Sequence, residues 1–362
     1  MKKLIIFLAL SLYIPIIYSQ RVDLDRFNFL VSYRDFPENP LPEMYKTYNV
    51  RMEAAPSLGL GLAAENLTND ISIEGLKKVT GTGHITILLI LDDLVFEKPE
   101  TIETITTTKD KEGHEIKKSN FSTKVAYTFG ARMSVYDYRG NTIVDNQVLF
   151  DRASQRFYQS PQTNSAEEAS SYFNNKISEI RSNITNQLTL SVTAETNNWL
   201  NAQYGYPARR VNDILWILNN KRHKSYRDQQ KAWNQFKEAI ALANSDEPLD
   251  NVKKKMQPVI DYFENAKKQY VTSSKEDRKM RYASYYDLAK IYLYLDEPEK
   301  AMTEADALAM NDFDERDGRA LRQEALVLQN KLRKNNANSR HFAVDVSSYA
   351  SPLEQQGVSV NQ

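Results

Sequence analysis

The chain has 362 residues, with 47 basic and 47 acidic side chains, so its formal net charge at pH 7 is zero. This balance argues against a protein that binds nucleic acid through a diffuse basic surface. Cysteine is absent, which excludes disulfides, thiolate metal sites and cysteine nucleophiles, and the 4 histidines include no closely spaced pair. We therefore expect a folded globular protein that is not an enzyme and that has no cofactor or metal site.

The N-terminus has the three-part pattern of a secretory signal peptide. Lys2 and Lys3 precede a mostly apolar run that ends at Ile17, and Ser19 offers a small residue at the cleavage point. The run is shorter than the roughly 20 apolar residues of a membrane-spanning helix, although an uncleaved anchor remains the alternative. No cysteine follows it, which argues against a lipid anchor. We predict a signal peptide over residues 1–19 and a mature chain without a transmembrane segment.

Residues 20–220 are expected to form an α/β domain, beginning with strands. Residues 45–54 alternate apolar and polar side chains, 71–79 form a shorter candidate, and 84–96 are nearly continuously apolar, as in a strand covered on both faces. Residues 125–138 and 142–150 predict an antiparallel hairpin, with Gly140 in its turn. The polar stretch 98–124 is interpreted as a protruding ribbon or a mobile loop.

From residue 165 the apolar period becomes helical. Ser165 and Glu168 form a capping box at the start of a long helix, which we expect to reach about Ala202, before Gly205 and Pro207. Residues 211–218 are interpreted as a strand that returns to the sheet, with a short helix as the alternative. Residues 221–334 predict a series of helices, and 335–362 predict a largely disordered tail.

Two of these helices carry a recognisable spacing. The residues that form this spacing are Tyr285, Leu288, Ala289, Tyr292, Ala301 and Ala305. The pattern resembles a tetratricopeptide repeat (TPR), a helix–turn–helix unit of about 34 residues. It departs from the repeat at Tyr285, Leu308 and Phe313, where Trp, Ala and Pro are usual. The resemblance implies a TPR-like stack over 221–334 and a surface that binds other proteins; an ordinary helical hairpin is the alternative. The expected fold class is α+β.

Other motifs point only weakly to chemistry. Gly59, Gly61 and Ala64 formally fit a dinucleotide-binding motif, but the helix after it would be very short, and we interpret the two glycines as part of a loop. Asp92 and Asp93 follow the most apolar strand, and adjacent strand residues face opposite ways, so we do not expect them to act on one substrate. His223 lies in a basic cluster that we interpret as solvated, and His84 is expected at a strand start. The tryptophans, which could stack on sugars, are expected to serve packing: Trp199, Trp216 and Trp233.

The resulting hypothesis is an exported, non-enzymatic scaffold or adaptor that binds protein components of a bacterial cell-envelope assembly, transport or secretion complex. A cysteine-free exported chain fits the periplasm, and we expect it to associate with the outer membrane. Three Asn-x-Ser/Thr triplets, at Asn66, Asn120 and Asn183, keep a secreted or cell-surface protein open as an alternative. The competing functions are an exported hydrolase and a glycan- or small-ligand-binding protein, each with its site in the α/β domain. The partner-binding residues remain unknown at this stage.

Overall fold

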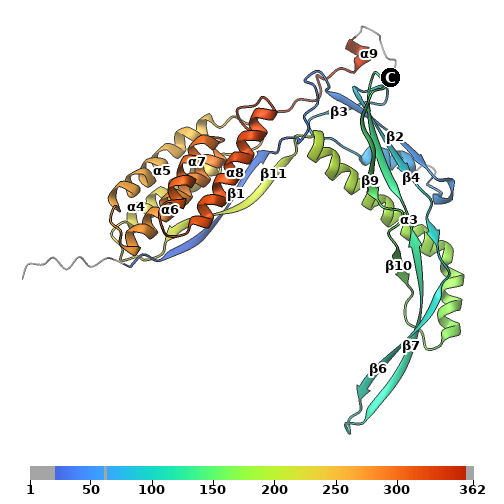
Figure 1. Cartoon of the computed structure of the whole chain (residues 1–362). Coiled ribbons are helices and arrows are strands. Elements are labelled where there is room, and N and C mark those ends of the chain that lie inside the picture. Colours follow the sequence, from blue (N-terminus) through green and yellow to red (C-terminus); the bar gives the residue numbers. More distant parts are fainter. Residues whose placement is uncertain (1–20, 61–62, 356–362) are drawn as a thin grey trace, which may run out of the picture. The chain divides into compact units, whose positions relative to one another are not determined.

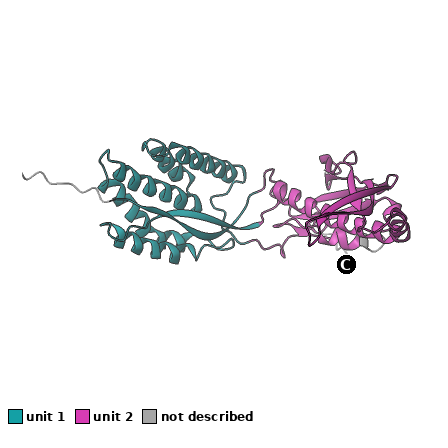
Figure 2. Ribbon diagram, turned by 90° about the horizontal axis from the view of Figure 1, so that it is seen from below, with its two compact units in different colours: residues 1–36, 208–343 teal, residues 37–207, 344–362 magenta. Residues whose placement is uncertain are grey.

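The structure is a computed structural model that describes residues 21–60 and 63–355. It has the expected α+β class, with a strand-rich part, a long helix and a C-terminal helical stack. The predicted signal peptide over 1–19 lies outside the described residues. The chain forms two compact units, which Figure 2 colours separately. Unit 1 comprises residues 1–36 and 208–343, and unit 2 comprises residues 37–207 and 344–362.

This division differs from the predicted boundary near residue 220. Residues 211–218 do form a strand, as we preferred, within β11 (Ala208–Leu218). However, β11 does not return to the main sheet. It pairs antiparallel with β1 (Leu24–Arg34) over the full length of both strands, as Figure 1 shows. Both strands therefore belong to the helical unit, whose chain is discontinuous.

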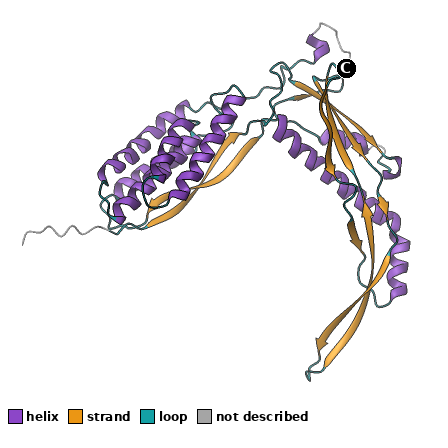
Figure 3. Ribbon diagram, in the orientation of Figure 1, coloured by secondary structure: helices purple, strands orange, loops and turns teal. Residues whose placement is uncertain are grey.

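Unit 1 consists of this two-stranded ribbon and a stack of helices (Figure 3). The helices lie within the predicted range 221–334: α4 (Tyr226–Ile240), α5 (Asp250–Gln269), α6 (Lys275–Tyr294), α7 (Pro298–Ala309) and α8 (Glu315–Lys334). Pro258 lies inside α5. Ser225 stands at the N-cap of α4, yet its hydroxyl does not cap the helix and instead pairs with the Tyr270 hydroxyl.

Unit 2 is built on a mixed sheet with the strand order β3-β2-β4-β8-β9. The strands are β2 (Thr47–Ala54), β3 (Lys77–Lys78), β4 (Ile85–Leu91), β8 (Ala131–Asp137) and β9 (Thr142–Phe150). The β8–β9 hairpin is the predicted one, and Gly140 adopts a φ of 87° in its turn. A 3-10 turn (Pro56–Leu58) and α2 (Ala63–Asp70) follow β2. Gly59 ends that turn at a φ of 62°, in agreement with a loop, whereas Gly61 lies outside the described residues and Ala64 lies in α2.

Three strand predictions need correction. The candidate over 71–79 contributes only the two residues of β3. The apolar run 84–96 divides into β4 and the short β5 (Val95–Phe96), and β4 is fully buried on one face only. Residues 125–138 do not form one strand. The strand is interrupted at Phe129 and Gly130, which separate β7 (Glu115–Thr128) from β8, and these two strands lie in different sheets.

The stretch 98–124 is a ribbon, as one of the two interpretations proposed. In it β6 (Glu100–Lys109) pairs with β7, which also pairs with β5 and with β10 (Arg156–Gln159). The long helix is α3 (Ala166–Tyr204), and the Ser165 side chain accepts a hydrogen bond from the Glu168 N–H as the capping box predicts. Helix α3 buries one stripe of apolar residues in the core that it shares with the sheets, including Phe173, Ile184 and Leu200.

The predicted disorder of residues 335–362 is wrong for the part that the structure describes. Arg340 and His341 are buried in unit 1, and the segment 344–355 belongs to unit 2, where α9 (Pro352–Gln355) lies. Polar composition misled the prediction, because these residues are held largely by ion pairs and main-chain hydrogen bonds, together with the stacking of Phe342 on Phe36. Residues 356–362 lie outside the described part.

Candidate functional site

Helices α4 and α6 of unit 1 hold the β1–β11 ribbon against their side chains. The ring of Phe27 packs edge-on against Trp233 at a centroid distance of 4.2 Å. Phe29 packs in the same way against Phe236 at 5.1 Å and against Tyr294 at 5.5 Å. The alternation of β1 directs these two rings to one face, so a single strand contacts both helices.

The open edge of β11 is bound through its main chain. The N–H of Trp216 donates to Oδ1 of Asp287 on α6 at 2.8 Å. Two residues later, the N–H of Leu218 donates to Oε1 of Gln229 on α4 at 2.6 Å. Both acceptors are buried. The helices thus hold an extended segment by apolar contacts and by side-chain acceptors for its backbone, which is how a helical groove can hold a peptide.

The polar groups beside this edge form a connected set. Asp287 is fully buried, and burial raises the pKa of its carboxyl group well above the ordinary value. One turn further along α6, Lys290 Nζ lies 3.0 Å from Asp213 Oδ2 on β11 and 2.9 Å from Glu324 Oε2 on α8. Burial lowers the pKa of Lys290, but these two carboxylates more than reverse the effect and the pKa is raised. Lys290 is therefore a charged link between β11, α6 and α8.

A pocket of 580 Å³ opens next to this link. Its walls come from the end of β1, the end of α6, one side of α8 and Arg340; they comprise Tyr33, Asp35, Leu293, Tyr294, Ala320, Gln323, Glu324, Val327, Leu328, Lys331 and Arg340. Lys331 Nζ pairs with Asp35 Oδ1 at 2.6 Å at the rim. Val327 is 46% exposed, so the α8 wall presents an accessible apolar side chain between charged groups. The pocket is the candidate functional site.

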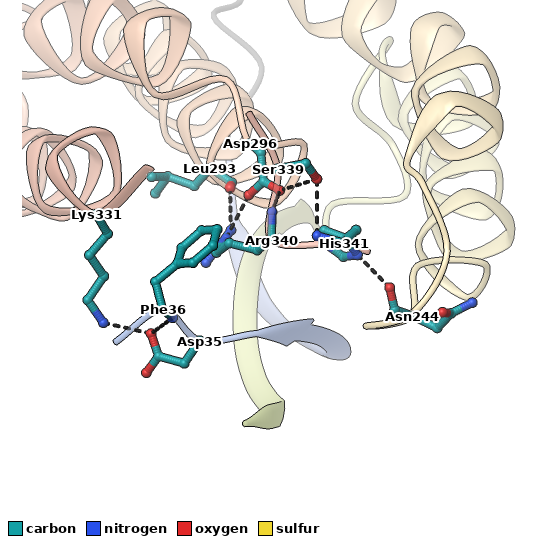
Figure 4. Close-up of polar contacts among 9 residues, drawn as sticks. All are labelled: Asp35, Phe36, Asn244, Leu293, Asp296, Lys331, Ser339, Arg340 and His341. Carbon is teal, nitrogen blue, oxygen red and sulfur yellow. Dashed lines mark hydrogen bonds and ion pairs between the residues drawn. The ribbon is translucent and has the colours of Figure 1, made fainter. Parts of the chain in front are cut away.

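Arg340 lines the pocket and is held by polar contacts, which Figure 4 shows. Its Nε lies 2.6 Å from Oδ1 of Asp296, and its Nη2 donates to the Leu293 carbonyl at 2.7 Å. The guanidinium carbon lies 4.0 Å from the centre of the Tyr33 ring. The next residue, His341, contacts the Asn244 carbonyl through Nδ1 at 2.5 Å. The segment after α8 thus ties together the ends of β1 and α6 and the loop after α4.

The residues of the TPR-like pattern have a packing role in the structure. Leu288, Ala289, Ala301, Ala305 and Tyr292 are buried, whereas Tyr285 is half-buried beneath the Lys267 ammonium group. These residues do not line the pocket. Sequence reasoning missed the pocket residues, although Ala320, Gln323, Val327 and Lys331 recur on α8 at spacings of three and four, a signal for one helix face.

The acidic pair at the end of β4 does not form a joint site. Asp92 pairs with Arg132 at 3.2 Å, whereas Asp93 accepts a hydrogen bond from the Ser57 hydroxyl. The two carboxylates therefore have separate partners, as expected for adjacent residues that diverge. These contacts leave neither of them positioned as half of an acid–base pair.

His84 and His223, like His341, are buried. His84 lies at a strand start, as predicted, with Nδ1 2.8 Å from the Thr47 hydroxyl. The interpretation of His223 as solvated is wrong, because the ring is buried near Tyr270 and accepts the Ser225 N–H through Nδ1. Burial lowers the pKa of both histidines.

The tryptophans serve packing, as predicted. Trp233 stacks on Phe236 and Trp216 lies near Tyr282 and Tyr286, both in unit 1, while Trp199 packs near Tyr204 in unit 2. Trp199 also lines a second pocket of 580 Å³, whose walls include Asn39, Tyr45, Asp137, Gln203 and Tyr204.

One group in the described part of the chain has side chains that could hold a metal ion. Asp110, Glu112 and His114, in the turn between β6 and β7, each place one ligand atom within 4.8 Å of the others. Glu112 and His114 are exposed, and Asp110 already accepts their backbone N–H groups. The geometry is that of an Asp-stabilised turn.

A comparison with models of known protein families finds no match, and a comparison with curated protein sequences finds none either. Within the described residues, no helix is long and apolar enough to cross a membrane.

Proposed function

We propose that the protein is an exported, non-enzymatic scaffold of a bacterial cell envelope, and that its TPR-like helical unit binds an extended segment of a partner protein. The observation that carries this proposal is the way in which the helices of unit 1 bind β11. Asp287 and Gln229 bind the backbone of an extended strand, and the adjoining face of α8 borders an open pocket with apolar and charged walls. A partner segment in the pocket is bound in the same way as β11, by apolar contacts and by side chains that accept its backbone N–H groups.

The chemistry of the pocket favours a segment with an apolar anchor and few charges. Its charged side chains are already paired, Lys331 with Asp35 and Glu324 with Lys290. The rings of Tyr33 and Tyr294 and the side chain of Val327 offer apolar contact. A strongly charged ligand would have to displace these pairs, whereas an aliphatic or aromatic side chain fits between them.

A photo-crosslinking amino acid at Val327, introduced into the full chain in the native host, tests the proposal. We expect discrete adducts with envelope proteins, and we expect Ala320→Trp, which fills the pocket, to reduce them at least five-fold. The same crosslinker at Val271, which is 72% exposed and lies outside the pocket, serves as the control. Equal adducts from both positions, or none from Val327, would contradict the proposal.

The second pocket favours a second candidate function, that of a glycan- or small-ligand-binding protein. Trp199, Tyr45 and Tyr204 supply aromatic surface there, and Asn39 and Gln203 supply amides, which is the composition of many saccharide sites. Titration of the full chain with neutral disaccharides, followed by tryptophan fluorescence, tests this candidate. A saturable change that Trp199→Phe removes supports it, and an unchanged spectrum across the panel speaks against it.

A further inference from the structure

The outer part of the β6–β7 ribbon of unit 2, over residues 103–119, has little packing of its own, because all of its residues except Asp110 are exposed. Every residue of β6 is exposed except Ile102, which is half-buried, and Ile105 is 59% exposed. A two-stranded ribbon is marginally stable in water unless another strand or a packed face supports it. In the described part of the chain, β6 pairs only with β7, so its other edge is open.

The hydrogen bonds at the turn show which residues face the open edge. The Asp110 N–H donates to the His114 carbonyl at 2.9 Å, so the even-numbered residues of β6 exchange hydrogen bonds with β7. On the other edge of β7, the Phe121 N–H donates to the Thr163 carbonyl at 2.9 Å. Phe121 lies opposite Glu103, so the odd-numbered residues of β6 direct their backbone groups away from β7. The backbones of Glu103, Ile105, Thr107 and Lys109 therefore point to the open edge.

The sequence of this edge is complementary to itself. Antiparallel pairing about a two-fold axis at Thr106 places Thr104 opposite Thr108, and Glu103 opposite Lys109, at both ends of the interface. Paired threonines and opposite charges stabilise adjacent strands. In this register Glu103 of one copy forms a hydrogen-bonded pair with Lys109 of the other, and Ile105 does so with Thr107. These are the residues whose backbones face the open edge. Moving the axis to Ile105 instead removes the charge pairing within the strand, because Glu103 then lies opposite Thr107 and Lys109 lies opposite Thr101.

The open edge of β7 lacks this property. Lys117 and Lys118 lie side by side in its exposed part, and a two-fold axis at either residue sets lysine against its own copy. Lysine on an edge strand opposes pairing with another chain. Residues 104–108 of β6 carry neither a charge nor a proline. The difference between the two edges indicates which one accepts a further strand.

We propose that β6 is a self-pairing edge, through which two copies of this chain associate with Thr106 on the two-fold axis. The two ribbons then form one antiparallel sheet in the order β7-β6-β6-β7, and the interface is isologous. The pairing supplies each ribbon with the additional strands that it lacks. It also gives a scaffold two equivalent helical units, although the proposal does not depend on what those units bind.

The absence of cysteine allows a direct test with the full chain. Thr106 and its copy form a non-hydrogen-bonded pair, with Cα atoms about 4.5 Å apart, within the range of a disulfide. Under mild oxidation, Thr106→Cys should give a disulfide-linked dimer. Thr104→Cys alone should not, because its copy lies about 14 Å away along the strand. A mixture of Thr104→Cys and Thr108→Cys chains should be linked again, as the register requires.

Sedimentation of proline variants tests the edge independently. Ile105→Pro removes an N–H that faces the open edge and leaves the bonds to β7 intact, so we expect dimerisation to weaken at least ten-fold. Lys117→Pro makes the same change on the open edge of β7 and should leave dimerisation unchanged. Equal linking of Thr104→Cys and Thr106→Cys would overturn the proposal. So would a chain that stays monomeric at all concentrations and yields no Thr106→Cys dimer.

Discussion

Asp287 shows how one residue joins the helices to the ribbon of unit 1. Its Oδ1 accepts the Trp216 N–H, and its Oδ2 is buried without a partner. An ionised carboxylate in this position would lack most of its solvation, which is why the pKa of Asp287 is raised. The neutral acid keeps the acceptor that β11 requires and avoids a buried charge.

This protonation makes the stability of unit 1 dependent on pH. Because the pKa of Asp287 is higher in the folded chain than in the unfolded chain, its contribution is complete at a pH below the ordinary value of 3.8. The contribution is lost as the pH rises through the folded value. We expect Asp287→Asn, which keeps the acceptor but cannot ionise, to be at least as stable as the parent at pH 7 and to remove this decline.

Urea unfolding of the full chain between pH 4 and pH 8, monitored by tryptophan fluorescence, measures the effect. The matched control is Asp287→Leu, which leaves the Trp216 N–H without an acceptor and should cost about 1–3 kcal/mol at every pH. If Asp287→Asn followed the same pH dependence as the parent, the neutral carboxyl group would be the wrong assignment.

At the scale of elements, the helices were predictable because their signals are local. The capping residue Ser165 and the three- and four-residue apolar spacing of α4 to α8 lie within each helix, and Gly140 marks its own turn. Strand β1 carried a comparable signal that the prediction did not use: Phe27, Phe29, Val31 and Tyr33 alternate along it. Its pairing with β11 joins residues far apart in the sequence, and no local pattern specifies that partner.

The close approach of α7 to its neighbours depends on small residues. Ala289, Ala301 and Ala305 are fully buried, and a Cβ on Gly318 of α8 would lie 2.5 Å from the Ala309 nitrogen on α7. Such a distance leaves no room for a larger side chain. The small residues of the TPR-like pattern therefore set the spacing of these helices, whichever family they belong to.

Ala289→Arg should consequently destabilise unit 1. Overpacking costs about 1–3 kcal/mol, and a buried unpaired charge adds several more. Thr303→Arg, on the exposed side of α7, should change stability by no more than about 0.5 kcal/mol. Thermal melts of the two full-length variants make the comparison, and an Ala289→Arg protein that melts like the parent would refute the proposed packing.

At the scale of the whole molecule, neither compact unit is one continuous stretch of the chain. Unit 1 begins with β1, continues only at β11 and ends with the segment that contains Arg340. The predicted boundary near residue 220 followed the change from strand to helix periodicity. That change reflects the secondary structure and not the compact units, because the ribbon is buried against helices that lie later in the sequence. The pocket was unpredictable for the same reason, since its walls come from four parts of the chain: the end of β1, the end of α6, one side of α8 and Arg340.

A helical unit that depends on a distant strand should be weakened by a change in that strand. Phe29 is buried against Phe236 of α4 and Tyr294 of α6, so Phe29→Ala should cost about 3–5 kcal/mol. Its neighbour Asn28 is exposed, and Asn28→Ala should have little effect. Hydrogen exchange of the full chain should show faster exchange in α4 and α6 for Phe29→Ala alone. Unchanged protection of both helices would mean that they are stable without the ribbon, and a fragment of residues 221–340 would then fold by itself.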